Sequence, residues 1–328
     1  MRSEKMTEVR AIDAQGIAKY YGNFLAVDHI TFAVEQGEIF GFLGPNGAGK
    51  TTTIKMLTGV STPSDGRASV LGYDIVRQSV RAKSLIGIVP DISNTYDEIS
   101  AWSNLIFTAK LYGVPKARRN ERAKELLTRF DLYDRRHEKV GGFSSGMKRR
   151  VCIAMALMNE SKLLFLDEPT VGLDVESVIV IHELIRSLNE DGLTIFLTTH
   201  NIEEASQMCH RVAIINRGKI IAIDTPESLK RAMKGVQSIE VAFRSETPGL
   251  QASLEKLPSV KGAQKRGDKI RLLTDDPPRA LKELWRLIED NNLEPITMNT
   301  LGPSLEDVFL ELTGRAMEAE VIHGRGAR

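Results

Sequence analysis

The 328 residues, of which 42% are hydrophobic and 27% charged, supply enough apolar material for a buried core and for more than one domain. The formal net charge of +1 provides no global field that attracts polyanions, so we expect no nucleic-acid partner. Cys152 and Cys209 are far apart and form no CxxC pair, as in proteins of a reducing compartment. No stretch approaches the roughly 20 apolar residues of a membrane-spanning helix. We therefore expect any membrane role to be peripheral or to pass through a partner.

Apolar runs alternate with helical patterns through the first two thirds of the chain. Residues 38–43 predict a buried strand, and residues 50–57 predict a helix with Ile54 and Leu57 on one face. Further strands are expected at 163–166, 195–197 and 212–215, and helices at 101–112, 119–130, 147–159, 178–189 and 203–209. This alternation favours an α/β fold with a mostly parallel sheet covered on both faces. A charged, helical stretch at about 95–145 interrupts it and predicts a helical insertion.

A smaller α+β domain is predicted after a boundary near Lys234 and Gly235. Its expected elements are a strand through Ile239, Val241 and Phe243, a helix around Leu254, a strand through Ile270 and Leu272, a helix with Leu281, Leu284, Trp285 and Ile288 on one side, and a strand at 295–298. Ser304 with Asp307 predicts a capping box at the start of the last helix. The expected domains are thus 1–235 and 236–314, followed by a disordered tail at 315–328.

A glycine-rich turn follows the first predicted strand and matches the pattern G-x-x-x-x-G-K-[ST]. Glycines let consecutive backbone amides curl around phosphates, and the next helix directs its positive end at them. Lys50 supplies a mobile positive charge to phosphate oxygens, and the Thr51 hydroxyl can bind Mg²⁺. The pattern predicts that phosphate is bound by Gly44, Pro45, Asn46, Gly47, Ala48, Gly49, Lys50, Thr51 and Thr52.

Two adjacent carboxylates end the predicted strand at 163–166. Asp167 would lie beside the glycine-rich turn, where it can hold Mg²⁺ through water. Glu168 is one residue further along and is placed to take a proton from an attacking water. With Lys50, these residues predict a nucleotide-hydrolysing site.

Several further motifs resemble one family, the ATP-binding subunits of ABC transporters. Phe143–Met147 (Phe-Ser-Ser-Gly-Met) resembles the family's signature loop, and 171–174 (Val-Gly-Leu-Asp) resembles its D-loop. Thr198-Thr199-His200 resembles the loop of the switch histidine, and Tyr21 resembles the aromatic residue that stacks on adenine. Order and spacing match over residues 10 to 235, which predicts the ABC-type P-loop nucleotide-binding fold.

The resemblance implies an Mg-dependent ATPase that works as a head-to-tail dimer, expected to be a homodimer, with ATP and Mg²⁺ as cofactors. Ser144 and Gly146 of one subunit would meet the γ-phosphate held by the other, and His200 would contact that phosphate in its own subunit. Glu168, His200 and Lys50 are the implied catalytic residues. A separate membrane permease would hold the dimer at the cytoplasmic face of the membrane.

Two positions depart from the family pattern. Asp91 follows the predicted strand Ile86–Val89 and Pro90, where the family usually has glutamine, and Ser145 replaces a glycine of the signature loop. Asp91 can still bind Mg²⁺, together with Thr51 and Asp167. Because Lys50, Asp167, Glu168 and His200 are all present, we expect hydrolysis to be retained.

The end of the chain resembles subunits that pair with exporter-type permeases, on the segment Pro303–Gly314. It favours an ATP-hydrolysing subunit of an exporter for drugs, antibiotics or sodium. Two alternatives stay open: an ABC ATPase with no transport role, and a degenerate module that senses ATP without hydrolysing it.

Overall fold

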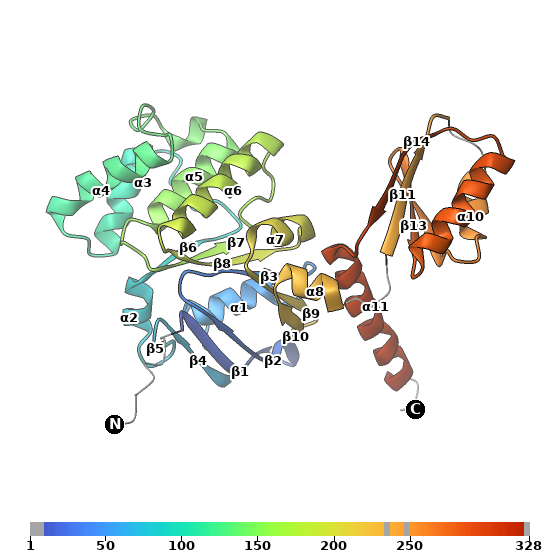
Figure 1. Ribbon diagram of the computed structural model, residues 1–328. Helices are drawn as coiled ribbons and strands as arrows, with labels where there is room; N and C mark the ends of the chain where they lie inside the picture. Colours follow the sequence, from blue (N-terminus) through green and yellow to red (C-terminus); the bar gives the residue numbers. More distant parts are fainter. Residues whose placement is uncertain (1–9, 233–236, 246–248, 325–328) are drawn as a thin grey trace, which may run out of the picture. The chain divides into compact units, whose positions relative to one another are not determined.

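The computed structural model describes residues 10–232, 237–245 and 249–324 (Figure 1). The chain forms two compact units, residues 1–226 and 227–328. The predicted boundary near Lys234 and Gly235 lies outside the described residues. Within the described ranges, no helix combines the length and the apolar character needed to cross a membrane.

A six-stranded sheet forms the centre of the first unit, and it contains every strand predicted for this unit. Its order is β10-β9-β3-β8-β7-β6, in which β9, β3, β8, β7 and β6 are parallel and β10 is antiparallel to β9. The strands are β3 (Ile39–Leu43), β6 (Ile86–Val89), β7 (Leu163–Asp167), β8 (Thr194–Thr199), β9 (Arg211–Asn216) and β10 (Lys219–Asp224). Buried on both faces, β3, β7 and β8 read as continuous apolar runs, which is why the sequence reveals them.

A second, antiparallel sheet has no counterpart in the sequence-based prediction. It has the order β2-β1-β4-β5, with β1 (Ile12–Tyr21), β2 (Phe24–Val34), β4 (Asp65–Val70) and β5 (Tyr73–Asp74). Helix α1 (Lys50–Leu57) packs between this sheet and the central one (Figure 1). The shared core centres on Phe196, whose ring centroid lies 5.5–6.1 Å from those of four other phenylalanines, Phe32, Phe40, Phe42 and Phe165.

Helices cover the other face of the central sheet (Figure 1). Of these, α5 (Ser145–Ala156) and α7 (Ile202–Met208) contact strands of the sheet, and α6 (Val175–Glu190) packs on α5. The chain also forms α3 (Ala101–Leu111) and α4 (Lys116–Arg129), α2 (Ser79–Ser84) beside β5 and β6, and α8 (Pro226–Ala232) after β10. A single turn of 3-10 helix, η1 (Val140–Gly142), precedes α5. The region predicted as a helical insertion holds α3 and α4, which pack against α5. Each predicted helix is present, with ends that differ by a few residues.

The second unit is a four-stranded antiparallel sheet with the order β12-β13-β11-β14. Its elements are β11 (Gln237–Phe243), α9 (Leu250–Glu255), β12 (Gly262–Arg266), β13 (Lys269–Thr274), α10 (Pro277–Asp290), β14 (Pro295–Leu301) and α11 (Leu305–Gly324). The chain order βαββαβ with this strand order is the ferredoxin-like arrangement. One face of the sheet packs on α9 and α10 through an apolar core that includes Val241, Leu272 and Leu284.

Three features of this unit differ from the sequence-based expectation. Strand β12 was not predicted, because Gly262–Arg266 is polar and short. Trp285 is 49% exposed, since Leu284 and Ile288 occupy the buried stripe of α10 and the next position points about 100° away. Helix α11 passes Gly314 and reaches Gly324, where a disordered tail was expected: one glycine costs a helix only about 1 kcal/mol, and good helix formers follow it.

The predicted capping box begins α11. Ser304 Oγ accepts a bond from Asp307 N at 3.2 Å, and Asp307 Oδ2 accepts one from Ser304 N at 2.8 Å. The same Asp307 oxygen binds the buried Arg271 of β13 at 2.7 Å, and Arg271 also donates to Ser238 of β11 at 2.9 Å. The start of α11 is thereby fastened to the sheet.

Candidate functional site

The glycine-rich turn between β3 and α1 has the backbone that phosphate binding requires. Gly47 and Gly49 have φ of +80° and +106°, in the left-handed region that disfavours other residues. A Cβ on Gly44 would lie 2.3 Å from the carbonyl oxygen of Ile215, so the turn also passes too close to β9 for a side chain. The sequence places these glycines where a larger residue would change the path of the loop.

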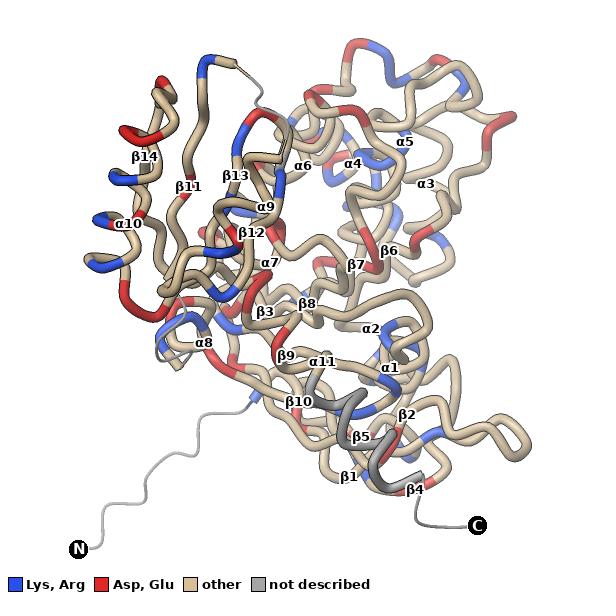
Figure 2. Tube along the Cα trace, turned by 90° about the vertical axis from the view of Figure 1, so that its right-hand side faces the viewer, with Lys and Arg blue, Asp and Glu red and all other residues tan. Residues whose placement is uncertain are grey.

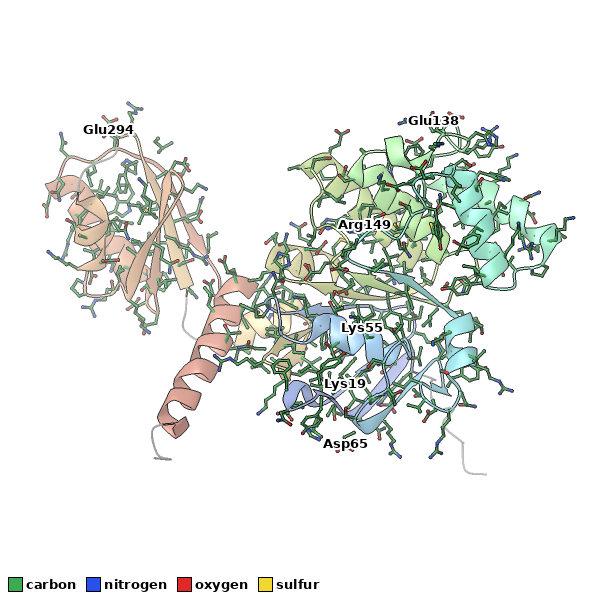
Figure 3. All side chains as sticks on the ribbon, turned by 180° about the vertical axis from the view of Figure 1, so that it is seen from behind. Lys19, Lys55, Asp65, Glu138, Arg149 and Glu294 are labelled. Carbon is green, nitrogen blue, oxygen red and sulfur yellow. The ribbon has the colours of Figure 1, made fainter. Side chains whose placement is uncertain are left out.

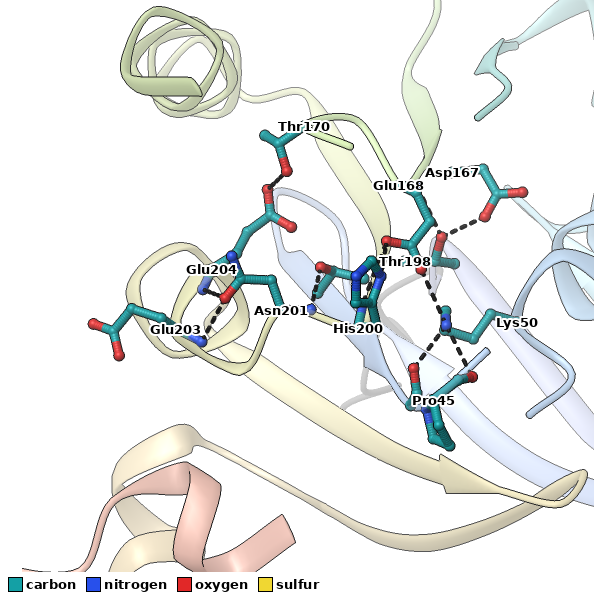
Figure 4. Close-up of polar contacts among 12 residues, drawn as sticks. Pro45, Lys50, Asp167, Glu168, Thr170, Thr198, His200, Asn201, Glu203 and Glu204 are labelled. Atoms are coloured by element: carbon teal, nitrogen blue, oxygen red, sulfur yellow. Dashed lines mark hydrogen bonds and ion pairs between the residues drawn. The ribbon is translucent and has the colours of Figure 1, made fainter. Parts of the chain in front are cut away.

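Lys50, the first residue of α1, turns back over the loop (Figure 4). Its side chain is only 6% exposed, and Nζ donates to the carbonyl oxygens of Gly44 at 2.7 Å and Pro45 at 3.1 Å. Nζ also forms an ion pair with Glu168 Oε1 at 3.0 Å. The sequence-predicted cation and one of the sequence-predicted carboxylates are thus in direct contact.

Glu168 and His200 directly follow two neighbouring parallel strands, β7 and β8, and meet at the edge of the sheet (Figure 4). His200 Nδ1 lies 2.8 Å from Glu168 Oε2, and the His200 backbone N–H donates to the same oxygen at 3.3 Å. Because an ionised carboxylate only accepts hydrogen bonds, Nδ1 carries the proton in this contact. Glu168 has φ of +50°, a strained value for a residue with a side chain and one that occurs preferentially at functional sites.

Asp167, the last residue of β7, directly precedes Glu168 and is 3% exposed. Thr198 Oγ1 donates to Asp167 Oδ1 at 2.5 Å, and the Glu168 N–H donates to Thr198 Oγ1 at 3.1 Å. Burial raises the pKa of the Asp167 carboxyl, while hydrogen bonds from Thr198 and Thr51 lower it. Sequence analysis named Thr198 only as part of the Thr198-Thr199-His200 motif and gave it no role of its own; its place at the polar end of the apolar run 195–197 is the signal that could have identified it.

The side chains at this point suit a hard cation that is shared with a phosphate. The Thr51 hydroxyl is close enough to Asp167 to lower the pKa of that carboxyl, and Asp91 lines the same pocket as Thr51. No group of three or more histidine, cysteine or acidic side chains that could bind a metal by themselves occurs in the described part of the chain. Mg²⁺ binds in this way, through one or two protein oxygens together with phosphate and water.

A pocket of about 350 Å³ joins these residues to the predicted adenine-stacking position. Tyr21 ends β1 and is 49% exposed, and it lines the pocket with Phe24 and Ala26 of β2. The remaining lining residues include Asn46, Gly47, Gly49, Lys50, Thr51, Thr52, Asp91 and Glu168. Phe24, which is 66% exposed, was not identified from the sequence.

Ser144 and Gly146, the signature-loop residues, line a different pocket, of about 310 Å³, together with Asp174 and Ser177 of the D-loop and α6. Ser144 caps α5 by accepting a bond from Met147 N at 3.2 Å. Gly146 has no room for a side chain, since a Cβ there would lie 2.2 Å from Ser177 Oγ. One chain therefore brings Lys50, Asp167, Glu168 and His200 together but leaves Ser144 and Gly146 outside that pocket.

Asp91 is held by its main chain. Arg149 of α5 donates to the carbonyl oxygens of Pro90 at 2.6 Å and Asp91 at 2.7 Å. Arg149 is 5% exposed and lies in the interior, between the helices and the central sheet (Figure 3). Burial lowers the pKa of Arg149, against the opposing effects of Cys152, Asp91 and Asp167. The helix that begins at the signature loop is thus bonded directly to the loop that carries Asp91.

A phosphate cradle with a lysine, and a carboxylate pair at the ends of adjacent parallel strands, define a P-loop nucleotide-binding protein. The profile of the ABC transporter family matches residues 27–171. Curated relatives extend the similarity over nearly the whole chain, and the chain belongs to the ATP-binding subunits of ABC transporters, as the sequence motifs predicted. It is accordingly an ATPase.

Three relatives show the extent of this similarity. The linearmycin resistance ATP-binding protein LnrL of Bacillus subtilis (strain 168) is 36% identical over 93% of this chain and 99% of its own length. The Nod factor export ATP-binding protein I of Rhizobium sp. (strain N33) is 37% identical over 94% and 98%. The daunorubicin resistance ATP-binding protein DrrA2 of Streptomyces coeruleorubidus is 35% identical over 94% and 96%.

Solved structures match about two thirds of the chain. The cbiO1 protein of Clostridium perfringens, part of the ABC transporter complex cbiONQ, superimposes with a TM-score of 0.63 at 28% identity, covering 69% of this chain and 92% of that one. A dimeric ATP-binding cassette in a post-hydrolysis state, bound to ADP and Pi, has the same fold, with a TM-score of 0.59 at 24% identity over 65% of this chain and 98% of that one.

Proposed function

We propose that this chain hydrolyses Mg-ATP as a head-to-tail dimer and thereby powers export through a separate membrane permease. The observation that carries the proposal is the chain of contacts from Lys50 to Glu168 to His200 at the mouth of the glycine-rich turn. Relatives whose names refer to antibiotic resistance and Nod factor export support the direction of transport.

Glu168 is the general base in this proposal. Its Oε2 is oriented by His200, while its Oε1 pairs with Lys50. Phosphate oxygens in the cradle compete for Lys50 Nζ, which leaves Oε1 free to accept a proton from the attacking water. His200, which is 47% exposed, presents the other side of its ring to the γ-phosphate.

Thr51, Asp167 and Asp91 are the proposed ligands of Mg²⁺. Held by these residues, the metal ion would neutralise the negative charge that develops on the phosphates. Around it, the Thr198 bond holds Asp167 in one orientation, and the Arg149 bonds fix the main chain at Asp91. Tyr21 is the proposed stacking surface for adenine.

The position of the signature loop supports the proposed dimer. Ser144 and Gly146 line a pocket of their own, separate from that of Lys50. A second copy in head-to-tail orientation would bring its Ser144 to the phosphates held by this copy, with the N-terminus of α5 directed at the negative charge.

An exposed apolar surface supports a membrane-protein partner, and with it a location at the cytoplasmic face of the membrane. Helix α3 and the loop before it expose six apolar side chains, Ile92, Tyr96, Ile99, Phe107, Leu111 and Tyr112. Tyr96 and Phe107 pack edge to face with ring centroids 5.0 Å apart, and Leu111 is one turn from Phe107 and 68% exposed. Apolar side chains gathered in this way indicate an interaction site. We propose that this α3 surface receives the permease.

Two measurements test the function. In steady-state Mg-ATP hydrolysis, Glu168→Gln is expected to lower kcat by about 10²- to 10⁴-fold, the usual contribution of a general base. ATP binding is expected to persist or strengthen, because the neutral amide competes less for Lys50. Equal turnover by the two proteins would reject Glu168 as the base, and a wild-type chain without turnover would favour the ATP-sensing alternative.

The partner is tested by affinity purification from detergent-solubilised membranes. A stoichiometric polytopic membrane protein should co-purify with the wild-type chain and be lost with Leu111→Glu. Val80→Glu, at an 80%-exposed apolar residue of α2, is the matched control and should keep the partner. Recovery with ribosomal or DNA-associated factors instead would point to an ABC ATPase with no transport role.

A further inference from the structure

Glu204 of α7 is a buried carboxylate that touches none of the predicted nucleotide ligands. It is 2% exposed, and its Oε1 accepts a hydrogen bond from the Thr170 hydroxyl at 2.8 Å (Figure 4). The same oxygen lies 2.9 Å from His182 Nε2 of α6. Its other oxygen, Oε2, is buried and makes no hydrogen bond to any residue that the structure describes. Burying a carboxylate this deeply is unfavourable, which indicates that its two contacts have a structural role.

These contacts bracket the D-loop, Val171–Asp174. Thr170 immediately precedes the D-loop and lies two residues after Glu168, while His182 belongs to α6, which begins directly after Asp174. One carboxylate oxygen therefore binds both the segment that enters the D-loop and the helix that leaves it. Contact at both ends restricts the loop more than contact at either end alone.

Glu204 itself belongs to the segment that carries His200. Asn201, the next residue, caps α7 by accepting bonds from the N–H groups of Glu203 at 3.0 Å and Glu204 at 3.2 Å (Figure 4). The Glu168–His200 contact joins the ends of β7 and β8 on one side. The Thr170–Glu204 bond joins the segments that continue from those two strand ends, so the two segments are linked at a second point.

We propose that Glu204 is a positioning residue that makes the Glu168 turn, the D-loop and the His200 segment move as one body. This inference rests on the proposed function. Without the link, Glu168 and His200 are each still anchored by a strand, but the alignment of their side chains depends on the contacts that His200 makes with Glu168 Oε2. A misplacement of about 1 Å can lower a rate by about 10²-fold. Because Glu204 does not line the nucleotide pocket, the loss should appear in kcat while KM for ATP stays unchanged.

Neighbouring glutamates provide a matched pair of variants. Glu204→Ala removes both contacts, whereas Glu203→Ala removes an exposed carboxylate of the same helix that accepts a hydrogen bond from Gln207 at 2.7 Å. We expect Glu204→Ala to lower kcat at least tenfold with KM within twofold of wild type, and Glu203→Ala to change neither. Glu204→Gln keeps an acceptor oxygen and should restore most of the turnover.

A double-mutant cycle with His200→Ala distinguishes positioning from a general loss of structure. If Glu204 acts by aligning His200 with Glu168, Glu204→Ala should lower kcat less than threefold in the His200→Ala background. An equal loss in both backgrounds would overturn the proposal. So would a kcat for Glu204→Ala within twofold of that for Glu203→Ala, or a KM that rises as far as kcat falls.

Amide hydrogen exchange, followed on the chain without nucleotide, tests the link independently of catalysis. Glu204→Ala and Thr170→Val should both speed exchange at residues 170–174 at least tenfold, and Glu203→Ala should not. Thr170→Val serves the same purpose if Glu204→Ala does not fold. Unchanged exchange in a folded variant would refute the link, whereas a wild-type chain without turnover would refute the proposed function and leave this measurement to decide the link.

Discussion

Replacing Arg149 with methionine tests whether α5 holds the loop that carries Asp91. Methionine keeps an apolar stem of similar length but removes both donors, so the carbonyl oxygens of Pro90 and Asp91 lose their partners. An unpaired buried acceptor costs roughly 1–3 kcal/mol. Two effects reduce this cost: Asp91 is exposed, so its carbonyl oxygen can bind water instead, and the variant no longer buries a cation. We therefore expect a loss of about 2 kcal/mol in the free energy of unfolding of the first unit.

The two tryptophans allow this unit to be observed alone. Trp102 lies on α3, which packs against α5, and Trp285 lies on α10 of the second unit. In a Trp285→Phe background, urea unfolding followed by fluorescence reports on the first unit. The control is Arg118→Met, which removes an arginine of α4 that is 56% exposed and paired only at the surface. Such pairs contribute about 0–1 kcal/mol. Equal midpoints and slopes for Arg149→Met and Arg118→Met would refute the structural role of Arg149.

Three more changes have defined outcomes. Phe196→Ala removes the ring at the centre of the phenylalanine cluster and should destabilise the first unit by about 3–5 kcal/mol in the same fluorescence assay; a loss below 1 kcal/mol would contradict the packing. Asp307→Ala leaves its buried arginine partner on β13 unpaired and should cost about 3–5 kcal/mol in the second unit, followed through Trp285; unchanged stability would show that the ion pair does not hold α11. Hydrogen bonds to Asp28 and then Asp65 raise the pKa of His29, so the contribution of His29 to stability is complete below pH 6.5 and is lost as the pH rises through the folded-state pKa. The Tm of wild type should therefore exceed that of His29→Asn at pH 5.5 and equal it at pH 8.5, and a difference that does not depend on pH would contradict this.

Charge provides no simple guide to partners in this protein. Basic and acidic residues are interspersed along the side shown in Figure 2. The charged groups that matter for the proposed mechanism are few, and two of them, Lys50 and Asp167, are buried. Their effect depends on their contacts and not on the net charge of the chain.

Local sequence determined the elements of the nucleotide site. The glycine-rich turn, Lys50 and the Asp167–Glu168 pair are recognisable because a phosphate cradle needs particular backbone angles and a strand end presents its last residues at the sheet edge. The buried strands β3, β7 and β8 can likewise be recognised in the sequence as apolar runs. The antiparallel sheet was missed because β1 and β2 mix exposed and buried positions and carry irregular registers, which weakens their period.

Tertiary structure alone decided which side chains support that site. Thr198 binds Asp167 across 31 residues of chain, Thr170 binds Glu204 across 34, and Arg149 binds Asp91 across 58. No local period encodes these pairings, because each depends on which strands become neighbours and on how helices cross the sheet. The sequence by itself identifies the residues that we propose to meet the nucleotide, because each lies in a short motif that is continuous in the chain. The fold determines the residues that hold them in place, since burial and alignment arise only when distant segments pack together.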